Sequence, residues 1–134
     1  MNKVKNLFLV DDDDIYTYFT TATIKETSLV EVIKVFGNGQ EAIDFLTENK
    51  NNPDSLPDVI FLDLAMPIMD GWGFLEEFIE LHPFIGKKIE IYVCTSSISP
   101  DDLEKVKKIT LVSDYIIKPL SQEILVKLIG KLNS

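Results

Sequence analysis

Five apolar runs alternate with five amphipathic segments, and this alternation constrains the fold more than any other feature of the chain. Alternating strands and helices with short connections favour a parallel sheet whose right-handed crossovers place helices on both faces. We therefore predict a single doubly wound α/β domain over residues 1–134. The runs, each of strand length, are Leu7 to Val10, Val30 to Phe36, Val59 to Leu62, Ile89 to Cys94 and Tyr115 to Ile117.

The segments between the runs carry helix signals. Asn38 is followed three residues later by Glu41, which is a capping pattern, and Ser99 stands before Pro100 and two acids. The residue before a proline is pushed out of helical geometry, so His82-Pro83 predicts the end of the third helix. In the last segment one apolar stripe is predicted to cover the sheet: Ile124, Leu125, Leu128, Ile129 and Leu132.

Composition narrows the class of protein. With 46% hydrophobic and 26% charged residues the chain has the make-up of a soluble globular domain. A net charge of −9 argues against direct nucleic-acid binding, which relies on Lys and Arg. The N-terminus fits neither a signal peptide nor a membrane span, so the cytoplasm is the expected location. Cys94 lies in an apolar run and is predicted to be a buried, inert thiol.

Polar residues follow four of the apolar runs directly. Asp11 to Asp14 follow the first run, Asp63 the third, Thr95-Ser96 the fourth and Lys118-Pro119 the fifth. The carboxyl ends of parallel strands meet at one edge of the sheet, where ligands of such folds bind. Acids, a hydroxyl and a lysine are therefore predicted to converge there.

This combination suits an aspartyl-phosphate site. A carboxylate attacks phosphorus only if the charge on the phosphoryl group is neutralised, which requires a divalent cation and fixed positive charge. Asp11 and Asp12 beside Asp63 form a hard oxygen site of the kind that magnesium prefers. Lys118 can bridge Asp63 and a phosphoryl oxygen, and the Thr95 hydroxyl can bond another.

The same residues carry a family resemblance. Over essentially its whole length the chain resembles the receiver domain of two-component response regulators, which implies a flavodoxin-like sheet of strand order 2-1-3-4-5 with five helices. The segments that carry the resemblance are Leu9-Val10-Asp11-Asp12, Leu62-Asp63, Met66-Pro67, Met69-Asp70-Gly71, Val93-Cys94-Thr95-Ser96 and Tyr115-Ile116-Ile117-Lys118-Pro119.

The resemblance implies that Asp63 accepts phosphate from a histidine kinase or a histidine phosphotransfer protein. Mg²⁺ or Mn²⁺ would be bound by Asp63, directly by Asp12, largely through water by Asp11, and by the backbone carbonyl of Ala65. The protein would not be an enzyme toward a separate substrate, because its chemistry would be confined to gain and loss of phosphate on Asp63.

A switch is also implied by the resemblance. Thr95 and Lys118 would contact the phosphoryl group, and Thr95 with Tyr115 would act as the switch. The face formed by the fourth helix, fifth strand and fifth helix would then change its preference for a downstream protein. No output domain follows the fifth helix in this sequence, so a protein contact is the expected output.

An enzyme-class alternative assigns the nucleophile differently. A haloacid dehalogenase-like phosphatase would use Asp11 as nucleophile and Asp13, two residues later, as its second acid. Against it, the chain lacks room for a cap domain, and Met66-Pro67 and Asp70-Gly71 would be unexplained. Because Asp13 and Asp14 extend the acidic pair to four, the sequence leaves open which acids face the metal.

Other positions have no settled role at this stage. Ala65 and Ser97 occupy positions that tune dephosphorylation in the family, so the phosphate lifetime is open. The segment Leu81 to Glu90 is longer than a minimal connection and is a candidate surface of its own. His82 is interpreted as a helix cap rather than a phosphotransfer residue, while recognition and packing are equally compatible with Trp72.

Overall fold

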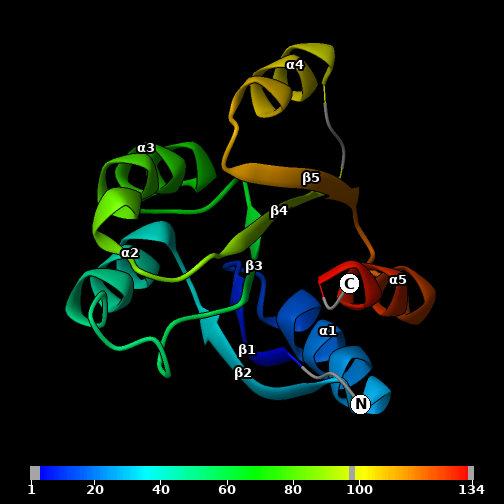
Figure 1. The fold of residues 1–134 in the computed structure, drawn as a ribbon. Helices are drawn as coiled ribbons and strands as arrows, with labels where there is room; N and C mark the ends of the chain where they lie inside the picture. The colour runs from blue at the N-terminus through cyan, green and yellow to red at the C-terminus, as the bar shows by residue number, and fades with distance from the viewer. Residues whose placement is uncertain (1–3, 97–98, 133–134) are drawn as a thin grey trace.

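The computed structural model describes residues 4–96 and 99–132. Its strands form one parallel sheet of order β2-β1-β3-β4-β5, which confirms the predicted fold and strand order (Figure 1). The strands are β1 (Val4–Val10), β2 (Val30–Phe36), β3 (Val59–Asp63), β4 (Glu90–Thr95) and β5 (Val112–Ile117).

Helices cover both faces of the sheet. α1 and α5 contact each other on one face and α2 and α3 on the other, while α4 lies beyond the edge strand β5 (Figure 1). Such two-sided cover is what right-handed crossovers between parallel strands produce. The helices are α1 (Asp14–Thr27), α2 (Gly39–Glu48), α3 (Gly71–Leu81), α4 (Pro100–Lys108) and α5 (Gln122–Leu132), with a 3₁₀ turn, η1 (His82–Phe84), after α3.

Two helix starts are capped as the sequence predicts. The side-chain oxygen of Asn38 accepts the backbone N–H of Glu41 at 3.0 Å, and Ser99 Oγ accepts that of Asp102 at 3.1 Å. At the end of α3 the backbone N–H of His82 donates to the Phe78 carbonyl, so His82 is a helix cap. The chain then makes η1 instead of stopping, because a proline is accommodated in the first turn of a helix.

Some predicted bounds need correction. β1 begins at Val4 and not at Leu7, because Val4 and Asn6 also pair with β2. β5 begins at Val112 and not at Tyr115, because this edge strand tolerates the exposed polar residues Ser113 and Asp114. On α5, Leu125 and Ile129 are buried, but Ile124 is 39% exposed and lies at the margin of the stripe.

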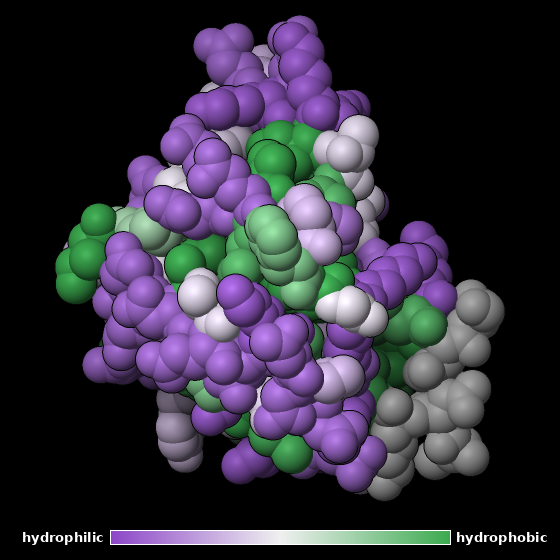
Figure 2. Space-filling view, turned by 60° about the vertical axis from the view of Figure 1, so that its left-hand side comes forward, coloured by the Kyte–Doolittle hydropathy of each residue, from purple (hydrophilic) through white to green (hydrophobic). Residues whose placement is uncertain are grey.

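The central strands are buried on both faces, as their continuous apolar sequences require. Alternate residues of β1 and β3 enter one core cluster under α2 and α3 and a second cluster under α1 and α5. Hydrophilic side chains cover most of the face seen in Figure 2, with hydrophobic groups gathered near its middle. Among residues 4–96 and 99–132, no helix is long and apolar enough to cross a membrane.

Candidate functional site

The fold brings the polar residues of four strands to one edge of the sheet. Asp11 directly follows β1, Asp63 and Thr95 are the last residues of β3 and β4, and Lys118 directly follows β5. The backbone N–H of Lys118 donates to the Thr95 carbonyl at 2.8 Å, which extends the β4–β5 pairing to the lysine. Predicted site residues from distant parts of the sequence are therefore neighbours.

Three carboxylates form a cluster with the chemistry of a cation site. One oxygen from each of Asp11, Asp12 and Asp63 lies within 4.8 Å of the other two. Asp11 and Asp63 are 3% and 8% exposed, whereas Asp12 is open to solvent. Carboxylate oxygens are the ligands that Mg²⁺ prefers, and Mg²⁺ usually retains several waters, which an exposed acid permits. The donor set thus fits Mg²⁺.

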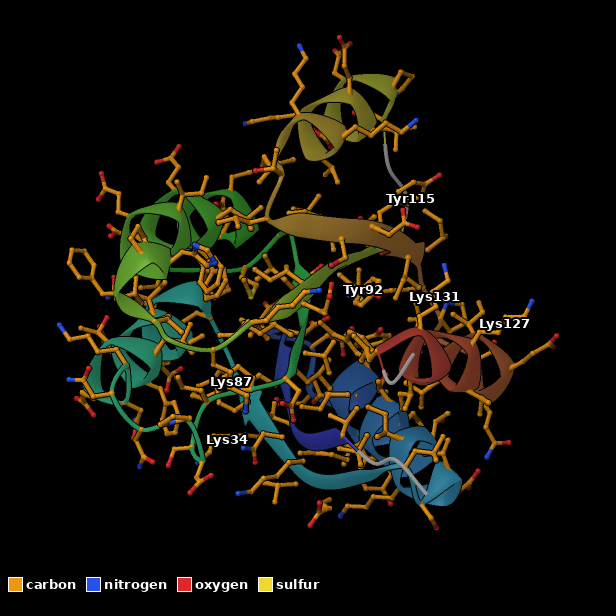
Figure 3. The ribbon with its side chains drawn as sticks, viewed as in Figure 1. Lys34, Lys87, Tyr92, Tyr115, Lys127 and Lys131 are labelled. Atoms are coloured by element: carbon orange, nitrogen blue, oxygen red, sulfur yellow. The ribbon has the colours of Figure 1, made fainter. Side chains whose placement is uncertain are left out.

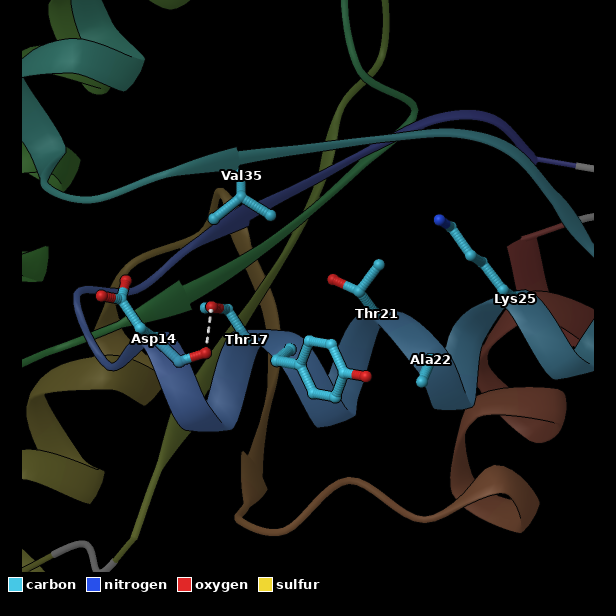
Figure 4. Close-up of a pocket in the computed structure, with 7 residues that line it drawn as sticks. Asp14, Thr17, Thr21, Ala22, Lys25 and Val35 are labelled. Atoms are coloured by element: carbon cyan, nitrogen blue, oxygen red, sulfur yellow. Dashed lines mark hydrogen bonds between the residues drawn. The ribbon is translucent and has the colours of Figure 1, made fainter.

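Asp13 and Asp14 have other positions. Oδ1 of Asp13 accepts the backbone N–H groups of Ile15 and Tyr16, each at 3.0 Å, so Asp13 is the N-cap of α1. Asp14 is the first residue of that helix and lines the groove between α1 and β2, where Val35 lies opposite (Figure 4). Asp13 therefore caps a helix, and Asp11 with Asp12 form the acid pair beside Asp63.

Lys118 supplies the fixed positive charge. Its Nζ lies 2.6 Å from Oδ2 of Asp11 and 3.3 Å from Oδ1 of Asp63, and its side chain is 14% exposed. The sequence predicted a contact with Asp63, but the nearer partner is Asp11. The Tyr16 ring also contacts this ammonium group, at 4.1 Å from Nζ to the ring centroid. Sequence reasoning missed Tyr16, whose only signal was its place in the first turn after the acidic run.

The cluster shifts the acid–base properties of its members. Burial raises the pKa of the Asp63 carboxyl, the charge of Asp11 raises it further, and Lys118 only partly offsets both effects. Burial by itself lowers the pKa of Lys118, but its hydrogen bonds and ion pairs with Asp11 and Asp63 together outweigh this and leave the pKa raised. Cys94, next to the site on β4, is buried as predicted, and burial raises its pKa to about 12.

The loop from Asp63 to α3 depends on a close backbone contact. The backbone N–H of Gly71 donates to the Leu64 carbonyl at 3.0 Å, and a Cβ on Gly71 would lie 2.5 Å from the Asp63 carbonyl oxygen. Asp70 caps α3 by accepting the Gly73 N–H at 2.9 Å. Asp70-Gly71 thus holds the start of α3 against the end of β3. The sequence offered these two residues only as a family signature.

The predicted switch residues lie on β4 and β5. Thr95 is 9% exposed. Tyr115 packs against a small cluster of Leu64, Val93 and Val106, on the side of β5 toward α4 (Figure 3). Ala65 follows β3 in an exposed loop, and its role as a metal ligand stays a prediction. Ser97 lies outside the described residues.

Trp72 belongs to the same cluster as Tyr115. It packs against the same three buried residues, and Nζ of Lys105 lies 4.2 Å from the centroid of its ring. Packing is therefore the observed role of Trp72.

The long segment before β4, Leu81 to Glu90, lies at the opposite edge of the sheet. Lys87 (Figure 3) donates to the carbonyls of Pro53 and Leu56 at 3.1 and 3.0 Å and pairs with Asp58 at 3.0 Å. Ile85 is buried, whereas Phe84 is 68% exposed. This segment holds neighbouring connections together at the amino ends of the strands, away from the acid cluster.

Known proteins are similar to this chain in fold and in sequence. A two-component response regulator from Cytophaga hutchinsonii has a solved structure with a TM-score of 0.89 and 30% identity, and the match covers 98% of each chain. The probable methanogenesis regulatory protein FilR2 of Methanothrix harundinacea is 29% identical over 87% of this chain and 74% of its own length.

A longer relative matches over one part only. Protein-glutamate methylesterase/protein-glutamine glutaminase 1 of Paramagnetospirillum magneticum is 30% identical over 86% of this chain but only 28% of its own length. The family model of the response regulator receiver domain matches residues 7–130. Because that match spans nearly the whole chain, this protein belongs to the family of response regulator receiver domains.

Proposed function

We propose that this protein accepts a phosphoryl group on Asp63 from the phosphohistidine of a histidine kinase or a histidine phosphotransfer protein. The observation that carries the proposal is the placement of Asp63 at the end of β3, within 4.8 Å of two other acids and 3.3 Å from the ammonium of Lys118. A nucleophilic carboxylate, a cation site and a fixed positive charge are the requirements of an aspartyl-phosphate site.

In the proposed transfer a carboxylate oxygen of Asp63 attacks phosphorus and forms the P–O bond. The P–N bond to the donor imidazole breaks, its electron pair stays on nitrogen, and that nitrogen is left to take up a proton. Mg²⁺ or Mn²⁺, bound by Asp11, Asp12, Asp63 and the Ala65 carbonyl, would neutralise charge on the phosphoryl oxygens. Lys118 would stabilise another of these oxygens through a charge-assisted hydrogen bond.

The output is proposed to be a change of protein partner. A phosphoryl group adds about −1.5 to −2 charge and new acceptor oxygens, so the Thr95 hydroxyl would turn toward it. Tyr115 packs against the cluster that includes Val106 of α4, and a shift of its ring would alter how α4 lies against β5. The face formed by α4, β5 and α5 would thereby bind a downstream protein differently.

The geometry also bears on the phosphatase alternative. Both oxygens of Asp11 already accept hydrogen bonds, Oδ1 from the Asp13 N–H at 2.9 Å and Oδ2 from Lys118 at 2.6 Å. An oxygen held in this way is a poorer nucleophile. The geometry favours Asp63 as nucleophile.

The test is the intact-protein mass after incubation with magnesium and acetyl phosphate. Wild type should gain one phosphoryl group, and Asp63→Asn should gain none. Labelling that survives in Asp63→Asn but not in Asp11→Asn, with continuous phosphate release, would support the phosphatase instead. If acetyl phosphate leaves wild type unlabelled, a phosphorylated histidine phosphotransfer protein replaces it as donor, and failure with that donor would overturn the proposal.

A further inference from the structure

The Tyr16 ring is the third group around the ammonium of Lys118. Nζ lies 4.1 Å from the ring centroid, 2.6 Å from Asp11 Oδ2 and 3.3 Å from Asp63 Oδ1. An aromatic face attracts an ammonium group at such a distance, and the attraction is stronger where water is excluded. The lysine side chain is only 14% exposed, so little water screens the attraction between the ring and the ammonium group.

The ring is held in place independently of the lysine. The backbone N–H of Tyr16 donates to the capping carboxylate of Asp13 at 3.0 Å, which fixes the first turn of α1. The half-buried side chain packs against the core cluster that lies under α1 and α5. Because α1 and the core determine its position, the ring is a fixed support for the longer and more flexible side chain of Lys118.

A ring has a specific advantage over a third oxygen at this position. An ammonium group has three N–H donors, and the two carboxylates accept from it already. Another acceptor oxygen would hold the lysine through a hydrogen bond that an incoming phosphoryl oxygen would have to displace. The ring attracts the charge without acting as such an acceptor, so a donor remains available for phosphate.

We propose that Tyr16 is a positioning residue for Lys118, and that its ring, not its hydroxyl, holds the ammonium where it meets the phosphoryl group. This role rests on the proposed phosphoryl transfer to Asp63. Tyr16 itself touches neither the phosphoryl group nor the metal in this scheme and acts only through Lys118.

The test compares Tyr16→Phe, which keeps a ring, with Tyr16→Leu, which keeps bulk but loses the aromatic face. Both are made in wild type and in Lys118→Met, and the rate of labelling by acetyl phosphate is measured at saturating magnesium. We expect Tyr16→Leu to slow labelling about 3- to 30-fold, and Tyr16→Phe to stay within about twofold of wild type. In the Lys118→Met background the two variants should label at the same rate.

Two controls separate this role from other effects. Tyr18→Leu removes an exposed ring from the same helix and should label at the wild-type rate. Urea unfolding of wild type, Tyr16→Leu, Lys118→Met and the double variant measures the coupling of the two side chains without phosphate. We expect the double variant to lose less stability than the two single variants together.

The contrary outcomes are distinct. Equal slowing by Tyr16→Phe and Tyr16→Leu, or a Tyr16→Leu effect of the same size in Lys118→Met, would overturn the positioning role. Absence of coupling in unfolding would overturn the contact itself, whether or not phosphate is accepted. If no donor labels wild type although Tyr16 and Lys118 are coupled in unfolding, the proposed transfer to Asp63 would be overturned. The role of Tyr16 in that transfer would fall with it.

Discussion

Gly71 shows how a single missing side chain sets the geometry beside the phosphoacceptor. An added Cβ would lie 2.5 Å from the Asp63 carbonyl oxygen and 2.8 Å from Leu64 Cα, and neither backbone atom can move cheaply. We therefore predict that Gly71→Ala lowers the free energy of unfolding by about 1–3 kcal/mol. Chemical denaturation measures this. Gly86→Ala is the control, since its Cβ would meet nothing within 4 Å, and an equal loss in both variants would refute the steric argument.

Ile68 has an unfavourable backbone conformation in the same loop. Its φ is 67°, in the left-handed region that β-branched residues rarely adopt, and its side chain is 83% exposed. Asn tolerates this region better than Ile, and little packing is lost with so exposed a side chain. We predict that Ile68→Asn raises the free energy of unfolding by about 1 kcal/mol. Thermal denaturation would contradict this if the variant melted below wild type.

Asp12 and Asp13 are neighbours with different tasks, so they give a matched pair of variants. Asp12 offers an oxygen to the acid cluster, whereas Asp13 caps α1. Asp12→Ala should weaken magnesium binding by at least about tenfold, because a charged ligand is lost. Asp13→Ala should leave that affinity nearly unchanged but lower stability by about 1 kcal/mol through the lost cap. Magnesium titration and urea unfolding measure both quantities, and a larger metal effect in Asp13→Ala would reverse the assignment.

At the scale of whole elements, α4 is held less firmly than the other helices of the described chain. Val106 is its one fully buried residue, and the contact of Lys105 with the Trp72 ring adds an attachment to α3. A helix with little buried surface opens at low free-energy cost. This loose attachment suits an element proposed to shift when Thr95 and Tyr115 respond to phosphate.

Removal of the contact between Lys105 and the Trp72 ring should increase local opening of α4 and of no other helix. An exposed cation–π contact is worth about 0.5–1 kcal/mol, so Lys105→Met should speed amide hydrogen exchange in α4 about 2- to 5-fold. Exchange in α3 should stay nearly unchanged, since the core holds that helix. Lys107→Met, on an exposed residue of the same helix, is the control. Equally faster exchange in Lys105→Met and Lys107→Met would show that the effect comes from the lost charge or from helix propensity, and not from the lost contact with Trp72.

Across the whole molecule, the parts that the sequence predicted are those that depend on local pattern and on parallel topology. The caps at Asn38 and Ser99 are local hydrogen bonds, and the meeting of Asp11, Asp63 and Lys118 follows from strands that end at one edge. The contact of Tyr16 with Lys118 was not predictable, because it depends on how α1 packs beside the end of β5.

The acid cluster also makes the stability of the whole molecule depend on pH. Burial and the charge of Asp11 raise the pKa of Asp63 in the folded protein, so ionisation of Asp63 opposes folding. Protonation of Asp63 therefore stabilises the folded protein. This stabilisation is complete below the ordinary pKa of a carboxyl group and is lost as pH rises through the folded-state pKa of Asp63. At neutral pH without divalent cations, the ionised Asp63 therefore destabilises wild type, whereas the uncharged side chain of Asp63→Asn should not.

We predict that Asp63→Asn unfolds with a free energy about 1 kcal/mol higher than that of wild type at pH 7. The difference should shrink as pH falls toward 4, because wild type then binds the proton that neutralises the site. Urea unfolding in chelator at a series of pH values measures it, with Glu77→Gln, an exposed acid on α3, as a control that should change little. A stability gain that stays constant with pH would show that it arises from something other than the charge of Asp63.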